Sequence, residues 1–185
     1  MKLKYFILPV VLLFVGAGCA VQQPATAPEL SNKEVVYSLP GVSFVVPQGT
    51  MIFGEGSTSS NGGSYVSLWD VETYESIKKQ NLESFDGPAT VDITSDVLPK
   101  GMSAEQWLKQ KSGHYSAGMK VEPVVVSNLQ AVKTHAEGLF SLDIVAIPTL
   151  DKSRIIVIAY DVEFMNSYGQ QVMNSLKFDS AVQPK

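Results

Sequence analysis

The chain has 185 residues, and its 14 basic and 18 acidic side chains give a formal net charge of −4. Arg154 is the only arginine, and no basic stripe is present that could neutralise phosphates, so the composition argues against nucleic-acid binding. A single cysteine leaves no partner for an intramolecular disulfide, so the stability of the folded part must come from a hydrophobic core.

The N-terminus has the parts of a secretory signal. Lys2 and Lys4 are followed by the apolar run 5–17, and small residues precede Cys19. Two other interpretations are an ordinary signal cleaved nearby and an uncleaved membrane helix. The helix is disfavoured because a span needs about 20 apolar residues, whereas this run is shorter and contains Pro9.

The four residues that end this segment resemble the recognition box of bacterial lipoprotein signals. In that family the last residue of the box is a cysteine that receives acyl chains such as palmitate. Ala17, Gly18 and Cys19 match the box, while Gly16 stands where the family usually has Leu, Val or Ile. The resemblance implies a signal peptide at 1–18, cleavage between Gly18 and Cys19, and attachment of the protein to a membrane through lipid on Cys19.

Cleavage after residue 18 would leave 167 of the 185 residues, enough for one domain of ordinary size. It removes two lysines, so 12 basic residues would face 18 acidic ones, a formal charge of −6. Residues 19–34 combine two prolines with small and polar residues, which predicts a lipidated cysteine followed by a flexible tether. A single globular domain is expected at 35–180 and a loose tail at 181–185.

Five segments have the apolar alternation or the continuous apolar run that is typical of strands. The stretch 154–160 (RIIVIAY) is apolar almost without a break, so we expect it to be covered on both faces and to lie near the centre of the sheet. The short connection 150–153 predicts a hairpin between it and the strand before it. The five predicted strands are 42–46, 65–71, 89–94, 140–146 and 154–160.

Three helices fit between and after these strands. Ser103 is followed three residues later by Gln106, which is the pattern of a capping box, and a short helix should begin there. Apolar residues that recur every fourth position from 164 to 176 predict a C-terminal helix, with Asp161 near its start. A further helix is expected within 74–85. Together these elements predict an α+β fold, a mainly antiparallel sheet with helices on both faces in an α/β/α sandwich.

Three segments resemble the PsbP-like family, which includes photosystem extrinsic subunits, a Ran-binding nuclear-import factor and many bacterial envelope lipoproteins. They are 44–49 (FVVPQG), 98–108 (LPKGMSAEQWL) and 173–178 (MNSLKF). The resemblance spans residues 35 to 180 and implies the PsbP-like fold and a bacterial setting. No binding residue of the family can be transferred position by position.

Catalytic signatures are weak in this chain. It has no G-x-S-x-G turn, and its only cysteine is assigned to acylation, so His114 and His135 are better explained as solvent-exposed side chains than as catalytic bases. The glycine-rich run 54–64 lacks the lysine of a phosphate loop and predicts a long hairpin connection. Trp69 and Trp107 are expected to be core aromatics.

The densest acidic group consists of Asp70, Glu72 and Glu75, whose oxygens could hold a divalent cation, although a solvated edge explains the same charges. Two functions therefore remain open. The first is a non-enzymatic envelope lipoprotein on the extracytoplasmic side of a bacterial membrane, without a cofactor, that binds a protein partner. The second is a small-ligand or cation-binding protein, or a hydrolase that uses Asp70, Glu72 and Asp92.

Overall fold

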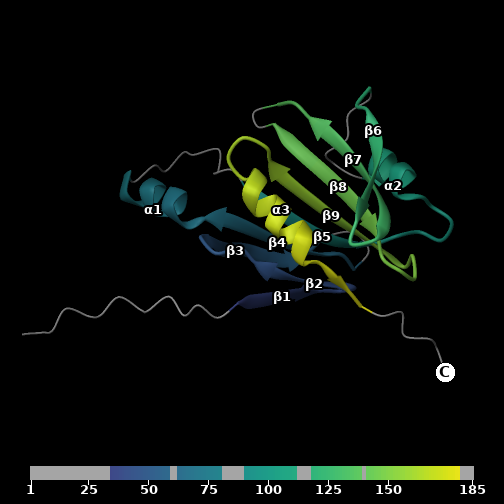
Figure 1. Cartoon of the computed structure of the whole chain (residues 1–185), viewed down its shortest axis with the longest axis horizontal. Helices are drawn as coiled ribbons and strands as arrows, with labels where there is room; N and C mark the ends of the chain where they lie inside the picture. Colours follow the sequence, from purple (N-terminus) through teal and green to yellow (C-terminus); the bar gives the residue numbers. More distant parts are fainter. Residues whose placement is uncertain (1–33, 59–61, 81–89, 112–117, 139–140, 180–185) are drawn as a thin grey trace, which may run out of the picture. The chain divides into compact units, whose positions relative to one another are not determined.

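Two antiparallel sheets make up the computed structural model, which describes residues 34–58, 62–80, 90–111, 118–138 and 141–179 (Figure 1). The main sheet has seven strands in the order β3-β4-β5-β9-β8-β7-β6, and the small sheet has the order β1-β2-β10. The main strands are β3 (Thr50–Ser57), β4 (Ser64–Asp70), β5 (Thr90–Val97), β6 (Val121–Val126), β7 (Leu129–Ala136), β8 (Leu142–Pro148) and β9 (Arg154–Asp161). The small sheet contains β1 (Val35–Leu39), β2 (Val42–Val46) and β10 (Lys177–Phe178).

Strand β9 occupies the fourth of the seven positions and is buried on both faces. Its neighbours β5 and β8 are both antiparallel to it, and Thr149 and Arg154 close the predicted hairpin from β8 with a backbone hydrogen bond of 2.9 Å. The prediction of a central strand from its continuous apolar sequence is therefore confirmed. Alternate side chains of β9 point to opposite faces, so this strand serves two hydrophobic cores.

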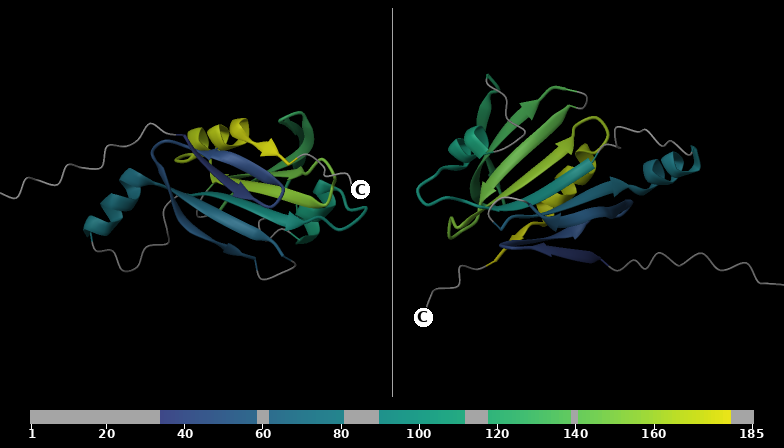
Figure 2. Two further views of the ribbon diagram at one scale, coloured as in Figure 1. Left: turned by 90° about the horizontal axis from the view of Figure 1, so that it is seen from below. Right: turned by 180° about the vertical axis from the view of Figure 1, so that it is seen from behind.

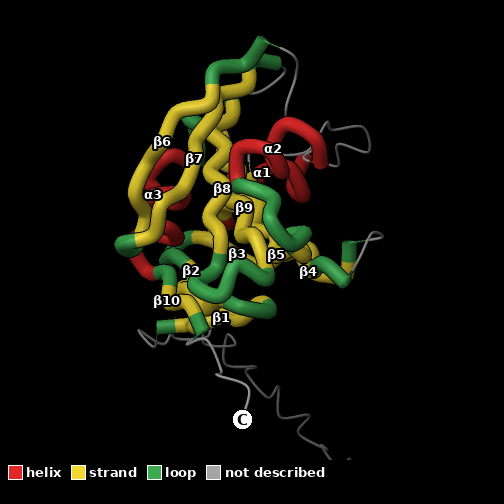
Figure 3. The backbone as a smooth tube through the Cα atoms, turned by 90° about the vertical axis from the view of Figure 1, so that its right-hand side faces the viewer, coloured by secondary structure: helices red, strands yellow, loops and turns green. Residues whose placement is uncertain are grey.

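The first core lies between the main sheet, the small sheet and helix α3 (Asn166–Ser175). The second lies on the opposite face, where helix α2 (Ala104–Lys111) covers the strands β7, β8 and β9. Figure 3 shows α3 and α2 on the two sides of these strands, and Figure 2 shows the same layers from below. The predicted α+β fold with helices on both faces of a mainly antiparallel sheet is confirmed.

Local sequence signals explain where the helices begin. Ser103 Oγ accepts a hydrogen bond from Gln106 N at 3.1 Å, and Gln106 Oε1 accepts one from Ser103 N at 2.9 Å, which is the reciprocal capping box. Asp161 Oδ1 accepts bonds from the backbone N–H groups of Glu163 and Phe164 in the turn before α3. The predicted C-terminal helix is therefore confirmed, but this turn shifts its start to residue 166 and leaves Phe164 exposed outside it.

The third predicted helix is present but lies earlier in the chain. Helix α1 (Val71–Gln80) follows β4 directly, and residues 81–89 lie outside the described part of the chain. The segment of Lys133 and His135, which the sequence also indicated as a strand, is β7, whereas β1, β3, β6 and β10 were not predicted, and each of these four lies at an edge of its sheet. Across the five described ranges, no helix is long and apolar enough to cross a membrane.

A glycine sets the distance between α3 and the central strand. Gly169 is buried in α3, and a Cβ atom built on it would lie 2.7 Å from Cδ1 of the Tyr160 ring and closer still to Cγ. Contacts this close do not occur between real Cβ atoms and their neighbours, so the helix can approach β9 only because residue 169 has no side chain.

We therefore expect Gly169→Ala to destabilise the domain by about 1–3 kcal/mol, because the added methyl group overpacks the contact with Tyr160. A loss of stability would indicate the contact with Tyr160, because at an exposed helical position alanine is more stabilising than glycine by about 1 kcal/mol. Urea denaturation followed by circular dichroism measures the change. The control Ser167→Ala, at an exposed position of the same helix, should stay within about 0.5 kcal/mol of the parent. Equal or higher stability of Gly169→Ala would contradict the proposed contact.

Candidate functional site

A polar network is built across three neighbouring strands on the face that α3 covers. The strand register places His135 of β7 opposite Asp143 of β8, and Asp143 opposite Tyr160 of β9. Lys133 lies two residues before His135 and therefore points to the same face. Antiparallel pairing thus brings together four chemically useful side chains from three strands, of which Tyr160 is the most distant in the sequence.

Asp143 is the centre of this network and is only 7% exposed. Its Oδ2 atom lies 2.5 Å from Lys133 Nζ and accepts a hydrogen bond of 3.3 Å from the Tyr160 hydroxyl. Its Oδ1 atom lies 2.9 Å from His135 Nδ1. Burial raises the pKa of Asp143, but the hydrogen bonds from Lys133 and His135 outweigh this and hold the pKa below its ordinary value, so the carboxylate stays ionised.

His135 lies between two carboxylates. While Nδ1 faces Asp143, Nε2 lies 2.9 Å from Glu137 Oε1. Carboxylates only accept hydrogen bonds, so both contacts are satisfied together only when the imidazole is doubly protonated. The hydrogen bond to Asp143 and then the one to Glu137 raise the pKa of His135. The side chain is 42% exposed, so the expectation of an exposed histidine is confirmed for His135.

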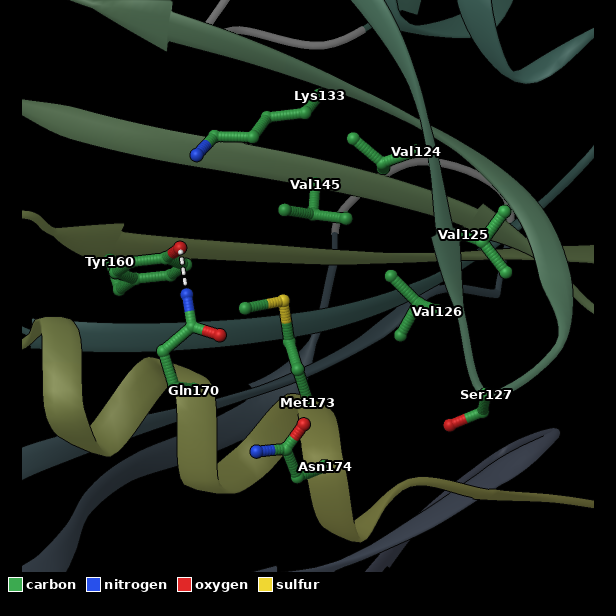
Figure 4. A pocket seen from close by; sticks show the side chains of 10 residues that line it. All are labelled: Val124, Val125, Val126, Ser127, Lys133, Val145, Tyr160, Gln170, Met173 and Asn174. Atoms are coloured by element: carbon green, nitrogen blue, oxygen red, sulfur yellow. Dashed lines mark hydrogen bonds between the residues drawn. The ribbon is translucent and has the colours of Figure 1, made fainter.

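The other end of the network faces a groove between α3 and the strand β6. The Tyr160 hydroxyl accepts a hydrogen bond of 3.1 Å from Gln170 Nε2, and Figure 4 shows both side chains at one end of the groove. The groove has a volume of about 390 Å³. Its lining comes from the strands β6 to β9, the turn after β6 and α3, and is half apolar and half polar: Val124, Val125, Val126, Val145 and Met173 are the apolar members, and Ser127, Lys133, Tyr160, Gln170 and Asn174 are the polar ones.

The chemistry of the groove favours binding over reaction. Burial and the neighbouring Asp143 carboxylate raise the pKa of Tyr160 to about 12, so its hydroxyl remains protonated at neutral pH. The Lys133 ammonium is already paired with Asp143. Apolar side chains beside hydrogen-bonding groups that are fixed in place can recognise a bound group, and the volume lies within the usual range of about 300–1,000 Å³ for ligand sites.

The predicted cation site does not converge. Asp70 instead caps α1, since its Oδ1 accepts a bond of 2.8 Å from Thr73 N, and its Oδ2 accepts one of 3.0 Å from the Tyr168 hydroxyl. Desolvation opposes ionisation of Asp70, but these hydrogen bonds lower its pKa overall. Glu72 and Glu75 lie exposed along α1. Within the described ranges no three His, Cys, Asp or Glu side chains are grouped closely enough to hold a metal ion, so the geometry gives the site no support.

The carboxylates proposed for a hydrolase are also separated. Asp92 bonds to the hydroxyls of Ser67 and Thr90, and Ser67 points to the opposite face of β4 from Asp70. Asp70 and Asp92 therefore lie on different faces of the sheet and cannot act on one substrate atom.

The remaining candidates have mixed outcomes. Gly18, Cys19 and His114 lie outside the described residues, so the lipid-attachment site remains a prediction. Trp107 belongs to α2, and its side chain is 6% exposed in the core on that side of the sheet, which confirms its assignment to the core, whereas Trp69 is only partly buried and stacks against Phe53. The run 54–64 is less of a loop than expected because β3 continues through its glycines to Ser57.

The sequence contained a signal for the network that we did not use. Lys133 and His135 alternate in an extended segment, and Asp143 follows after a short connection. A hairpin centred on residue 139 would pair His135 with Asp143, as the structure does. Tyr160 could not be added in the same way because its place beside Asp143 depends on the pairing of β8 with β9.

Comparison with solved structures supports the fold. The solution structure of cyanobacterial PsbP (CyanoP) from Synechocystis sp. PCC 6803 matches with a TM-score of 0.50 and 10% sequence identity. The match covers 83% of this chain and 98% of that chain. The domain therefore has a PsbP-like fold, as the sequence resemblance implied, and at this identity the likeness extends to the fold alone. No family model matches the sequence, and no curated protein is similar to it.

We expect the imidazole of His135 to titrate above pH 6.5, because Asp143 and Glu137 both accept from its protonated form. The stability that this contributes is fully present below the unfolded pKa of about 6.5 and is lost as the pH rises through the folded pKa. NMR titration of the imidazole resonances measures the value, and His135→Gln identifies the signal.

The variant Asp143→Asn should lower the pKa of His135 toward 6.5, because the amide carries no charge. Glu137→Gln is the matched control and should lower it less, since the Asp143 hydrogen bond is the larger cause. A pKa of His135 at or below 6.5 in the parent protein would contradict the geometry.

Proposed function

We propose that this chain is a bacterial envelope lipoprotein, in which acylated Cys19 anchors a non-enzymatic, PsbP-like accessory domain that binds a protein partner. Residues 19–34 would then act as the tether, and the domain would lie on the extracytoplasmic side of the membrane. The proposal joins two features: the signal-like segment that ends in GAGC at 16–19, and the PsbP-like fold of the domain behind it.

The observation that carries the binding part of the proposal is the groove beside β6. One wall comes from the outermost strand of the main sheet and the other from α3. Val124, Val126 and Met173 offer an apolar floor, while Gln170 and Asn174 are exposed on the helix at its rim. An apolar side chain of a partner can fill such a groove while its backbone bonds to the polar rim.

The fixed protonation states around the groove support recognition rather than catalysis. Proton transfer near neutral pH needs a group whose pKa lies near that pH. Tyr160, with a pKa of about 12, is far above this range, and Asp143 is held ionised by its cationic neighbours. Both side chains are therefore suited to holding a bound group in place.

The anchor is tested by Cys19→Ala. We expect the parent protein to incorporate a palmitate analogue and to fractionate with membranes, whereas Cys19→Ala should be unlabelled and soluble because no acyl chain attaches it. The control Ser31→Ala, in the tether, should behave as the parent. Circular dichroism of the released protein should match that of the folded domain. An unlabelled parent would overturn the lipoprotein assignment.

The groove is tested by site-specific photo-crosslinking in intact cells. A photoreactive amino acid at Asn174, which lines the groove, should yield a crosslinked product of higher mass. Asn166 is the matched control, since it is an exposed asparagine on the same helix that does not line the groove. Equal crosslinking at both positions, or none at Asn174, would contradict a partner in the groove.

The same experiment separates the second candidate function, binding of a small ligand, which the volume of about 390 Å³ favours. A protein partner shifts the product by the mass of a polypeptide. A small ligand leaves the gel mobility unchanged and adds a few hundred daltons, about the size that such a volume can enclose, to the crosslinked peptide in mass spectrometry.

A further inference from the structure

An exposed aromatic cluster lies at the edge of the main sheet where α1 begins. The ring of Phe53 stacks on Trp69, with centroids 3.5 Å apart and planes inclined by 12°, and Tyr74 meets Trp69 edge-on at 5.8 Å. Phe53 is 51% exposed, and the neighbouring Val71 is 38% exposed. We call Phe53, Trp69, Val71 and Tyr74 the aromatic end.

The helix that carries half of this surface projects from the sheet. Of the α1 side chains from Val71 to Lys79, only Tyr74 and Ile77 are partly buried, and all the others are exposed. Figures 1 and 2 show α1 extending beyond the strands in both views. The aromatic rings are therefore held at an extremity of the domain, where a flat surface can reach them.

The chain enters the domain at the same end. The first residue of β1, Val35, pairs with Val46 at the end of β2. The turn that follows β2 contains Gly49, whose carbonyl accepts a hydrogen bond of 2.9 Å from the N–H of Val71, the first residue of α1. Val35 and Val36 are themselves 56% and 58% exposed. The entry point of the tether and the aromatic end are thus one turn apart.

The tether is short, so it would keep the aromatic end close to the membrane that holds Cys19. Glu34 follows Cys19 by 15 residues, a segment that spans at most about 50 Å when fully extended. A flexible polar chain of that length has a root-mean-square span of about 20–25 Å. A surface held at such distances has an effective concentration in the millimolar range, at which weak contacts become occupied.

We propose that the aromatic end docks onto the lipid bilayer in which Cys19 is anchored. The inference rests on the proposed lipid anchor, which would hold the domain near the bilayer, and on the exposed aromatic rings, which would enter the membrane–water interface. Tryptophan and tyrosine are enriched at the membrane–water interface, where an apolar ring enters the acyl boundary and a polar edge stays among the headgroups.

The charges on α1 show which force drives the docking. Glu72, Glu75, Lys78 and Lys79 sum to zero, so the helix has no net attraction for anionic lipid. Burial of the rings must therefore supply the affinity, and binding should occur on zwitterionic vesicles and depend little on salt.

Docking in this way orients the rest of the domain. The aromatic end lies at the β3 edge of the main sheet, whereas the groove lies at the β6 edge, at the other end of the seven-strand order. With its β3 edge on the bilayer, the domain presents the groove away from the lipid, where a partner can reach it.

Vesicle binding of the unacylated chain tests the inference. The protein is the chain from residue 19 with Cys19→Ala, mixed with phosphatidylcholine vesicles at millimolar lipid that contain acyl chains brominated near the headgroup. We expect quenching of Trp69 fluorescence, with Trp107 as a constant background because its side chain on α2 is buried in the core and 6% exposed. The affinity should be weaker than that of a single myristoyl chain, about 10⁴ M⁻¹, so that docking is lost during cell fractionation.

Phe53→Ser should reduce partitioning about tenfold, since one aromatic ring no longer leaves water. Val71→Ser is a second variant that should also weaken binding, at a position where α1 is exposed. Leu150→Ser is the matched control, since Leu150 is 55% exposed in the turn between β8 and β9, outside both the aromatic end and the groove, and it should bind as the parent does. Circular dichroism confirms that each variant is folded.

If the protein does not bind pure-lipid vesicles, the inference is overturned, and the aromatic end would instead contact a protein. Equal partitioning of the parent, Phe53→Ser and Val71→Ser would overturn it as well. The anchor is judged separately by palmitate labelling at Cys19. If the parent protein is labelled with palmitate but the Cys19→Ala form does not bind vesicles, docking alone is refuted. If the parent protein is not labelled but the Cys19→Ala form binds vesicles, the anchor alone is refuted.

Discussion

The alternating side chains of β9 enter two hydrophobic cores, and the other elements of the domain are arranged to cover them. Ile156, Ile158 and Tyr160 lie in the core beneath α3, while Ile155 and Val157 lie in the core beneath α2. A strand buried on both faces needs paired strands on both edges and a layer on each side. The two helices and the small sheet meet that requirement, so the stability of the domain depends on this one strand being enclosed.

Burial of Tyr160 also explains why a charged network exists inside the fold. Its hydroxyl donates to Asp143, and a carboxylate that is 7% exposed would be costly without cationic neighbours. Lys133 and His135 lie on the adjacent strand at the positions that the register dictates. Throughout the described part of the chain every buried side-chain nitrogen or oxygen has a hydrogen-bond partner, so the network adds polarity to the core without leaving a group unsatisfied.

The two surfaces that we assign to binding lie at opposite edges of the main sheet, and both depend on how that sheet ends. At the β3 edge, α1 continues the direction of β4 and carries Tyr74 to Trp69 and Phe53. At the β6 edge, α3 stands far enough from the strand to leave a groove. The central strands form the core, whereas the two surfaces lie at the β3 and β6 edges of the sheet. The structure of these edges therefore determines what the domain can contact.

The sequence by itself determined the central part of the fold, because burial on one or both faces leaves a direct mark in the order of apolar residues. The run 154–160, the alternation at 89–94 and the capping box at Ser103 each predicted an element that the structure contains. The edge strands were missed because backbone pairing forms them, and Pro123 in β6 and the glycines of β3 weaken their patterns. Only the tertiary structure decided the sites. It separated Asp70 from Asp92 and brought Lys133, Asp143 and Tyr160 together, because strand order and register set the distances between residues that the sequence keeps apart.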